Sequence, residues 1–324
     1  MTIRLLGFLA AFSLGSPALA GEQETANNGK LVMQGIPGIP AAVVDDLNRF
    51  QNVRAASFLD WSADGNGIYV STRFADVNQV HRVDRPGGAR QQLTFFSEPV
   101  SEVQRRPGSN TLSFRRDAGG SEFAQIFLLD PKDGTAAMLT DGESRNGSTV
   151  WNRQGTQLSY QSTRRNGASN DVWLMDPADA DSSRVVLESP DGSSWTPTEF
   201  SASGSKLLIS NYVSVADSRI HLLDLDSGKN ITVSGGGEQS TSNYPLAFSE
   251  HDEGMWFITN RDGEFDQLAW QSFEAGSKPE IVTADIPWDV NAGAISNDRR
   301  RIAFLVNDDG RSMLYLLDAR TRQY

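Results

Sequence analysis

Residues 61–74 read WSADGNGIYVSTRF, and this stretch decides the fold. Trp61 ends one apolar run, Asp64 and Gly65 form a turn, and Ile68 starts a second apolar run. Because an Asp-Gly pair accepts the positive φ angles of a tight turn, the stretch predicts a β-hairpin. A single hairpin says little about the fold, whereas a hairpin that recurs at a fixed spacing indicates a repeat architecture.

The hairpin recurs along the chain. An aromatic residue followed four positions later by glycine returns at Trp151–Gly155 and at Phe200–Gly204. Weaker copies cover residues 103–108, 248–254 and 295–299, and an apolar strand follows every copy. A second pattern, apolar-x-x-apolar-Asp, occurs at residues 80–84, 126–130, 172–176, 220–224 and 314–318, with a degraded copy at 267–272. The first four copies of this second pattern are 46 to 48 residues apart.

Each unit of 46 to 48 residues therefore contains four short strands. A unit of this size corresponds to one propeller blade, whose small sheet buries its faces only when neighbouring blades stack against it. A β-helix needs shorter repeats, and a β-sandwich does not keep so long a period. We expect an all-β protein, a β-propeller of about six four-stranded blades, with blades near residues 55–100, 101–147, 148–194, 195–242, 243–287 and 288–324.

The sixth unit is incomplete, since its fourth strand is missing before Tyr324. An open propeller edge leaves backbone groups unpaired and apolar faces exposed. Two explanations are open. The segment around Lys30–Met33 could donate the closing strand, or the natural chain continues beyond Tyr324, which we favour.

The first twenty residues have the features of a signal peptide. Arg4 supplies positive charge, Leu5–Leu14 form an apolar core too short to span a membrane, and Ala18–Ala20 match the small-residue cleavage pattern. We expect cleavage after Ala20 and export to the periplasm, with secretion to the medium as the second choice. The chain has no cysteine, which excludes disulfides and a lipid-modified N-terminal cysteine. Residues 21–54 form a leader, with a stiff Ile36–Pro40 segment and a short amphipathic helix over residues 41–50.

The net charge narrows the classes of partner. At −12, the chain cannot neutralise a row of phosphates, which argues against nucleic-acid binding. The same charge argues against docking on an anionic membrane surface. No long apolar run follows the signal peptide, so we expect a soluble mature protein without membrane insertion.

The order of these features resembles known propellers. The tandem W-S-x-D-G turns, Ile/Val-x-x-Leu-Asp strands and final Leu-Thr pairs resemble TolB-type blades. The leader at residues 36–54, the run at residues 71–83, Pro86–Gly88 and Gln92–Phe96 resemble more closely the exported prolyl oligopeptidase family, which includes acylaminoacyl and dipeptidyl peptidases. The resemblance covers residues 36–324. It implies a propeller that restricts the access of peptides to a C-terminal α/β-hydrolase domain carrying the catalytic Ser, Asp and His.

No catalytic serine is expected in the chain itself. The nucleophile elbow G-x-S-x-G requires glycine on both sides of the serine, because its strained turn leaves no room for side chains. The nearest match, around Ser144, has Asn146 in place of the second glycine. Ser169 and Ser312 lack this second glycine as well, and all three serines fall in turns or hairpins of the repeat.

The other candidate catalytic and metal-binding residues belong to the repeat. His81 and His221 occupy the same position of two blades, and His251 falls in a hairpin turn, so the histidines do not suggest a triad. Without cysteine or paired histidines we expect no metal site and no cofactor. A ring of aspartates could suggest calcium, but their spacing fits residues that each cap the turn after a strand. These aspartates are Asp84, Asp130, Asp176, Asp224 and Asp318.

Recurring arginines are the one feature with potential for binding. They follow the second strand of their blades, and equivalent loops of successive blades lie on one face of a propeller. A basic arc of this kind could contact the carboxylates of a peptide or of a docked domain. The alternative, which we favour, is that loops such as Arg261–Gly263 are ordinary blade turns. The arginines are Arg73, Arg115, Arg116, Arg164, Arg165 and Arg261.

Two functions are consistent with these features of the sequence. The sequence favours the substrate-gating propeller of a prolyl oligopeptidase-like serine peptidase, whose partners are a peptide substrate and a C-terminal hydrolase domain absent from this chain. The alternative is a stand-alone TolB-like periplasmic propeller that binds protein or glycan partners. A binding propeller should complete its last blade, and this one does not.

Overall fold

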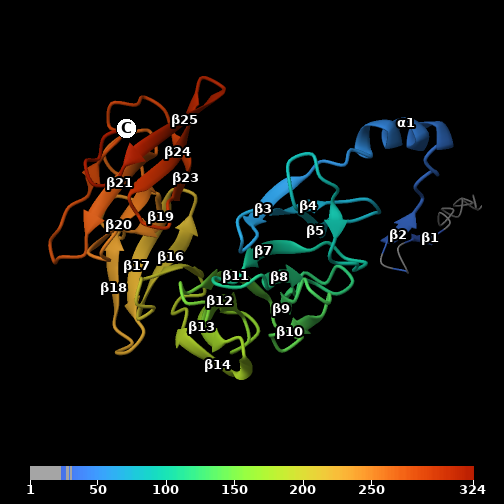
Figure 1. The fold of residues 1–324 in the computed structure, drawn as a ribbon, viewed down its shortest axis with the longest axis horizontal. Helices are drawn as coiled ribbons and strands as arrows, with labels where there is room; N and C mark the ends of the chain where they lie inside the picture. Colours follow the sequence, from blue (N-terminus) through green and yellow to red (C-terminus); the bar gives the residue numbers. More distant parts are fainter. Residues whose placement is uncertain (1–22, 27–28, 30) are drawn as a thin grey trace, which may run out of the picture. The chain divides into compact units, whose positions relative to one another are not determined.

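The computed structural model describes residues 23–26, 29 and 31–324 (Figure 1). These residues divide into two units, one that ends at Val53 and one that covers Arg54–Tyr324. The expected signal peptide, residues 1–20, lies outside the described residues.

The first unit holds a two-stranded sheet and a helix. Strands β1 (Gln23–Ala26) and β2 (Leu31–Gln34) are antiparallel. Helix α1 (Ala41–Gln51) starts after Pro40, and it ends where the N–H of Asn52 bonds to the carbonyl of Asn48. The helix expected over residues 41–50 is thus confirmed, although it buries none of its residues. Strand β2 pairs with β1 in a two-stranded sheet. Closure of the sixth sheet by the segment around Lys30–Met33 stays a prediction.

The second unit is the predicted β-propeller, built from six antiparallel sheets that follow one another along the chain (Figure 1). Blades 1 and 2 contain β3 (Ser57–Trp61), β4 (Ile68–Thr72), β5 (Gln79–Val83) and β6 (Gln91–Gln92), then β7 (Ser101–Arg105), β8 (Leu112–Arg116), β9 (Gln125–Leu129) and β10 (Ala136–Met138). Blades 3 and 4 contain β11 (Asn146–Trp151), β12 (Leu158–Ser162), β13 (Asp171–Asp176) and β14 (Asp179–Leu187), then β15 (Ser194–Phe200), β16 (Lys206–Ser214), β17 (Asp217–Asp224) and β18 (Asn230–Ser234). Blades 5 and 6 contain β19 (Asn243–Phe248), β20 (Gly254–Thr259), β21 (Gln267–Ser272) and β22 (Glu280–Ile281), then β23 (Val290–Ile295), β24 (Arg301–Asp308) and β25 (Arg311–Asp318).

Five sheets have four strands and the sixth has three, as the repeat predicts. Two first strands start slightly earlier than the expected blade limits of 148 and 195, since β11 begins at Asn146 and β15 at Ser194. The degraded copy of the third strand is β21, with the predicted bounds Gln267–Ser272.

In four of the six blades, a serine directly follows the first strand and shapes the turn after it. The Ser62 hydroxyl accepts the N–H of Gly67 at 2.9 Å and donates to Oδ1 of Asp64 at 2.5 Å, and it lies 3.0 Å from the Gly67 carbonyl, so it closes the hairpin between β3 and β4. In blade 5, the Ser249 hydroxyl accepts the N–H of Gly254 and donates to its carbonyl. Gly65 has a φ of 70°, a conformation that glycine adopts without strain.

The aspartates that end the third strands cap turns, with one exception. Asp130 and Asp176 each accept the backbone N–H two residues further on, at 2.9 Å. Asp224 and Asp318 bind turn N–H groups in the same way, so the interpretation as turn caps is confirmed for four blades. The expectation is wrong for Asp84, which pairs with Arg82 instead, at 2.6 Å. The physical reason is the residue two positions after Asp84, a proline, which has no N–H to donate.

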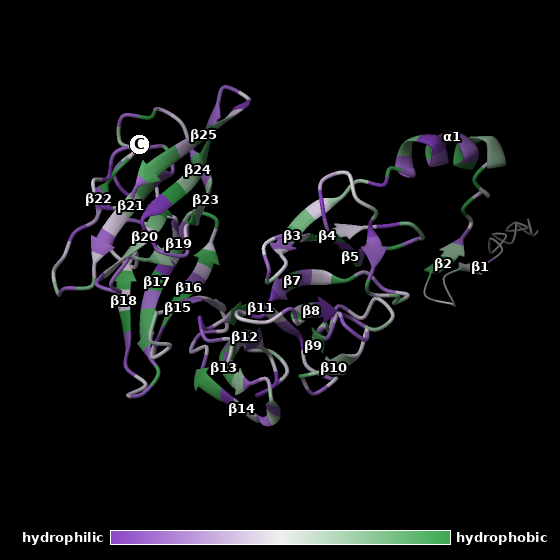
Figure 2. Ribbon diagram, viewed as in Figure 1, coloured by the Kyte–Doolittle hydropathy of each residue, from purple (hydrophilic) through white to green (hydrophobic). Residues whose placement is uncertain are grey.

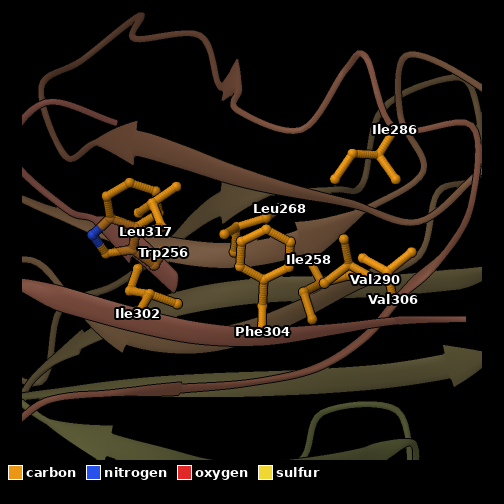
Figure 3. Close-up of a cluster of buried hydrophobic side chains, with 9 residues drawn as sticks. All are labelled: Trp256, Ile258, Leu268, Ile286, Val290, Ile302, Phe304, Val306 and Leu317. Atoms are coloured by element: carbon orange, nitrogen blue, oxygen red, sulfur yellow. The ribbon is translucent and has the colours of Figure 1, made fainter. Parts of the chain in front are cut away.

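The hydrophobic core is divided among the contacts between successive blades. Five clusters of buried side chains join blades 1–2, 2–3, 3–4, 4–5 and 5–6. Figure 3 shows the last of them, in which Trp256 of blade 5 lies near Ile302 and Leu317 of blade 6. In the described part of the chain, none of these clusters joins blade 6 to blade 1.

Candidate functional site

The candidate arginines lie at equivalent places in four blades. Arg73 follows β4, Arg115 and Arg116 end β8, Arg164 and Arg165 follow β12, and Arg261 follows β20. In an antiparallel four-stranded blade, the hairpin between the second and third strands lies at the same edge as the linker to the next blade. We call this edge the hairpin face. It comprises hairpins 73–78, 117–124, 163–170 and 260–266 and linkers 93–100, 139–145, 188–193, 235–242 and 282–289.

Arg116 fastens its hairpin to the preceding linker. Its Nη1 lies 2.9 Å from Oε2 of Glu98, and its guanidinium carbon lies 4.4 Å from the centre of the Phe96 ring. Hydrogen bonds from Ser97 and from the N–H of Gly119, together with Arg116, lower the pKa of Glu98. The Glu98 carboxylate therefore stays charged at neutral pH and holds this edge of the interface between blades 1 and 2.

Arg115 links blade 2 to blade 3. Its Nη2 lies 2.7 Å from Oε1 of Glu102, and its Nη1 donates to the carbonyl of Asn146 at 3.1 Å. The other carboxylate oxygen of Glu102 accepts the N–H of Ser148 at 3.0 Å. Both ends of the ion pair thus reach the first strand of blade 3.

Arg165 holds a fully buried carboxylate. Its Nε and Nη2 donate to the two oxygens of Asp171, at 2.6 and 3.0 Å, in a bidentate pair. Asp171 also accepts the N–H of Ser189 in the linker to blade 4, at 2.8 Å. The hydrogen bond and the charge of Asp171 raise the pKa of Arg165. This arginine therefore closes the edge between blades 3 and 4.

The remaining arginines are less enclosed. Arg164 lies 3.5 Å from Asp141 and over the ring of Trp173, and Arg261 lies 3.5 Å from Asp262. Both side chains are more than a third exposed. Arg73 also interacts with another residue. The topology thus brings the six arginines to one face, and Arg115, Arg116 and Arg165 hold parts of the fold together there. A binding arc stays a prediction that rests mainly on Arg164 and Arg261.

A cavity of about 550 Å³ opens between hairpin 260–266 and the linker to blade 6. Phe265, Ile281 and Ile286 supply an apolar lining, while Asp262, Glu264 and Asp285 supply carboxylates. The lining contains no basic side chain. The cavity therefore suits a ligand with an apolar body and a positively charged group.

A second cavity, of about 360 Å³, lies between blades 4 and 5, where the linker after β18, Arg261 and the turn between β21 and β22 form its wall. Arg261 and Lys278 line it together with the glycine segment 235–237, while Glu238 is its one carboxylate. Gln271 forms part of its wall and donates to the carbonyls of Val233 and Ser277, both at 3.1 Å. This cavity suits a negatively charged group. Neither cavity could be predicted from the sequence, because irregular linkers and turns form much of each wall.

His81 and His221 are core residues. Nδ1 of His81 lies 3.1 Å from the carbonyl of Gln79, and burial lowers the pKa of this fully buried ring. The ring of His221 packs on Trp195, with 4.5 Å between the ring centres, and burial lowers its pKa to about 4. His251 is exposed in its turn. In the described part of the chain, no hydrogen bond joins a serine to a histidine.

Ser144, the nearest match to a nucleophile elbow, has a structural partner. Its hydroxyl donates to Oδ2 of Asp141 at 2.5 Å, and its N–H donates to Oδ1 at 2.9 Å. Both bonds shape the linker from blade 2 to blade 3. Within residues 23–26, 29 and 31–324, no group of three or more acidic or histidine side chains could hold a metal ion, and no helix is long and apolar enough to cross a membrane.

Carboxylates on the first strands connect successive blades, a feature that the sequence analysis did not predict. Every first strand has a bulge where it pairs with the second strand, and a bulge re-aims side chains. Asp60 accepts the N–H of Arg105 in the next blade at 2.9 Å, and Glu199 accepts that of Phe248 at 2.6 Å. An acidic residue directly before the aromatic, as in Asp60-Trp61 and Glu199-Phe200, is the signal that could have revealed them.

Glu199 also meets a residue two blades away. It forms a hydrogen-bonded ion pair with Arg299, which lies in the turn between β23 and β24 of blade 6. Burial raises the pKa of Glu199, and the charge of Arg299 opposes this effect. The pair joins blades 4 and 6 directly.

Comparison with solved protein structures finds the same propeller fold. No protein-family model and no curated protein matches the chain. A prolyl endopeptidase structure superposes with a TM-score of 0.66 and 9% identity over 93% of this chain and 51% of that chain. A puromycin-hydrolysing peptidase of Mycobacterium tuberculosis gives a TM-score of 0.63 and 15% identity over 83% and 46%. TolB from Acinetobacter baumannii gives 0.54 and 12% over 95% and 76%.

The chain spans about half the length of the two peptidases. At these low identities the likeness concerns the fold. The resemblance to TolB-type and prolyl oligopeptidase-type blades is confirmed at that level, and the chain has the propeller fold found in prolyl endopeptidases and in TolB.

Proposed function

We propose that this chain is the substrate-gating propeller of a prolyl oligopeptidase-like serine peptidase. The observation that carries the proposal is the superposition on a prolyl endopeptidase, which takes in 93% of this chain and about half of that one. The catalytic serine, aspartate and histidine would belong to an α/β-hydrolase domain outside these residues. The role of this chain would be to decide which peptides reach that domain.

The two cavities that residues of hairpin 260–266 help to line support a peptide as the ligand. One cavity carries Asp262 and Glu264, and the other carries Arg261 and Lys278. A short peptide has a positive amino end and a negative carboxyl end, so two cavities of opposite charge are complementary to it. A long folded chain could not enter either cavity.

Peptide binding tests this arrangement directly. We expect short unblocked peptides to bind the purified chain in a calorimetric titration, and blocking either peptide end should weaken binding. Asp262→Asn with Glu264→Gln should lower the affinity for peptides with a free amino end. Arg311→Gln, on the exposed hairpin between β24 and β25, is the matched control and should bind normally. Equal affinity for free and blocked peptides would contradict the arrangement.

Gating is tested with a hydrolase domain added in trans. The isolated α/β-hydrolase domain of a prolyl endopeptidase is mixed with this chain and supplied with a short chromogenic substrate or a long unstructured polypeptide. We expect cleavage of the long substrate to fall relative to that of the short one. An unchanged ratio, without association of the two proteins, would overturn the proposal. The chain alone should not turn over chromogenic aminoacyl or acylaminoacyl substrates.

The second candidate is a TolB-like binding propeller. It is favoured by the superposition on TolB, which takes in 76% of that protein. Binding of an oligosaccharide or of a folded protein, without binding of short peptides, would support this candidate over the first.

We also propose that the protein is exported and that its mature form starts at Gly21. The proposal rests on the residues up to Ala20 and on the absence of cysteine. N-terminal sequencing of the protein recovered from a periplasmic fraction tests it. Recovery of the chain with Met1 intact from the cytoplasm would contradict it.

A further inference from the structure

The third strand of blade 5 departs from the repeat at one buried position. In the register of the sheet, Gln271 of β21 lies beside Met255, the first apolar residue of β20. The end of β21 is accordingly coloured as hydrophilic in Figure 2. Gln271 is nevertheless only 6% exposed, so a polar amide occupies a core position. The residues at this position in the other five blades are all apolar: Val83, Leu129, Met175, Leu223 and Leu317.

The amide of Gln271 is only half satisfied. Its Nε2 donates to the carbonyls of Val233 and Ser277, both at 3.1 Å. Its Oε1 is buried and accepts no hydrogen bond from the described residues. A buried acceptor without a donor has lost its hydrogen bonds to water and gained none in exchange, so it lowers the stability of the fold.

Gln125 of blade 2 shows that these blades can satisfy a buried glutamine completely. It is also 6% exposed, and its Nε2 donates to two carbonyls, at 3.0 and 2.7 Å. Its Oε1 accepts hydrogen bonds from the hydroxyl of Thr140 at 2.7 Å and from the N–H of Gly142 at 3.0 Å. The unpaired Oε1 of Gln271 is therefore not a general property of glutamines in the repeat, and it requires an explanation of its own.

The two bonds that Gln271 donates hold the walls of the cavity between blades 4 and 5. Val233 belongs to β18 of blade 4, and Ser277 lies in the turn between β21 and β22 of blade 5. Ser277 directly precedes Lys278, which lines the same cavity. A leucine in place of Gln271 could bind neither carbonyl, so the turn that carries Lys278 would lose its bond to the strand.

The cavity has the charges to bind a carboxylate. Arg261 and Lys278 line it from two different turns of blade 5, and Glu238 is the one carboxylate in the lining. Arg261 lies 3.5 Å from Asp262, but its side chain is 39% exposed. In the described part of the chain, Lys278 forms no ion pair. Both cations are therefore able to bind a negatively charged group.

We propose that Gln271 is the positioning residue of a carboxylate site between blades 4 and 5, and that blade 5 gives up stability to form this site. The ligand is the carboxyl end of a peptide. The inference rests on the proposed function, in which this cavity takes that end. Residues that break a local rule at a cost in stability are expected at sites that serve binding.

Calorimetric titration with a blocked peptide tests the binding role. An N-acetylated alanine tetrapeptide keeps its terminal carboxylate as its one charge, and the corresponding amide has no charge. We expect the wild-type chain to bind the acid about fivefold more tightly than the amide. Lys278→Gln and Gln271→Leu should each lose most of this preference. Lys132→Gln, in the equivalent turn of blade 2, is the matched control and should keep it.

Urea unfolding of the same variants tests the cost in stability. Gln271→Leu removes the unpaired acceptor and restores the apolar residue of the repeat, so the midpoint should rise by about 0.3 M or more. Gln125→Leu removes an amide whose two ends are paired, and its midpoint should fall. A purely structural role would make Gln271→Leu less stable as well, whereas a residue kept for binding gains stability while it loses affinity.

The outcomes separate failure of this inference from failure of the proposed function. A wild-type chain that binds acid and amide equally would contradict the carboxyl-end site and the inference together. A wild-type preference that Gln271→Leu keeps in full would overturn the inference alone. A urea midpoint that does not rise in Gln271→Leu would overturn it as well.

Discussion

Leucine at one repeat position should contribute very differently to stability in two blades. Leu174 of β13 is 4% exposed and packs between blades 3 and 4, whereas the equivalent Leu316 of β25 is 67% exposed. Leu174→Ala removes about three methylene equivalents from a buried site, which costs about 2.4 kcal/mol of transfer free energy. The cavity left behind brings the expected loss in the free energy of unfolding to about 3–5 kcal/mol.

Leu316→Ala removes the same atoms from a side chain that solvent already reaches. About a third of the transfer free energy, or about 0.8 kcal/mol, should be lost. No cavity contribution is expected, because the space vacated by the side chain opens to water. The two substitutions therefore share their chemistry and differ only in the presence of a following blade.

Urea unfolding followed by tryptophan fluorescence and by circular dichroism measures the difference. Leu174→Ala should lower the midpoint of unfolding clearly, and Leu316→Ala only slightly. Equal losses for the two variants would refute the reasoning, since they would mean that Leu316 is covered in solution.

Three further perturbations test individual contacts. Gly155→Ala should cost about 3 kcal/mol or more and Gly167→Ala about 1 kcal/mol in urea unfolding. Both glycines have positive φ, but a Cβ at Gly155 would lie 2.4 Å from the carbonyl oxygen of Pro107, whereas Gly167 has no atom within 4 Å; equal losses would contradict this. Arg165→Lys should cost about 2 kcal/mol, because lysine cannot keep both bonds to the buried Asp171, while Arg164→Lys should cost less than about 1 kcal/mol. The reverse order of these two losses would show that the bidentate pair is unimportant. His221 has its pKa lowered from 6.5 to about 4 by burial, so the unfolded state takes up its proton first and stability should fall as the pH drops from about 6.5 to 4. His221→Phe should flatten the pH dependence of the unfolding free energy in that window, and an unchanged slope would contradict this.

The sequence predicted the sheet architecture because the signals for it are local. A serine that closes a hairpin and an aspartate that caps a turn each bond within a few residues, so both recur in the repeat. The bounds of the degraded strand β21 could be read from spacing alone. The cap at Asp84 was mispredicted because one proline removed the donor, which a pattern of apolar residues and aspartates does not record.

The candidate site could be predicted only in part, because its residues meet across elements. The sequence placed the six arginines on one face, but it could not show that Arg116 reaches Glu98 in the preceding linker or that Arg165 holds the buried Asp171. Glu199 and Arg299 form an ion pair although they are 100 positions apart in the sequence and lie two blades apart. Contacts of this kind depend on how blades curve around one another, which no single repeat encodes.

The same reasoning explains why equivalent side chains differ in exposure between the inner blades and the two end blades. Within the repeat, a side chain such as Leu174 or Phe200 is buried by the neighbouring blade and not by its own sheet. The chemically similar Leu316 and Trp61 are exposed because the described residues place no blade beside them. Exposure at these positions therefore measures the presence of a neighbour. Fluorescence quenching in a protein whose other tryptophans are replaced measures the solvent access of Trp61. It would report directly whether another surface packs against blade 1.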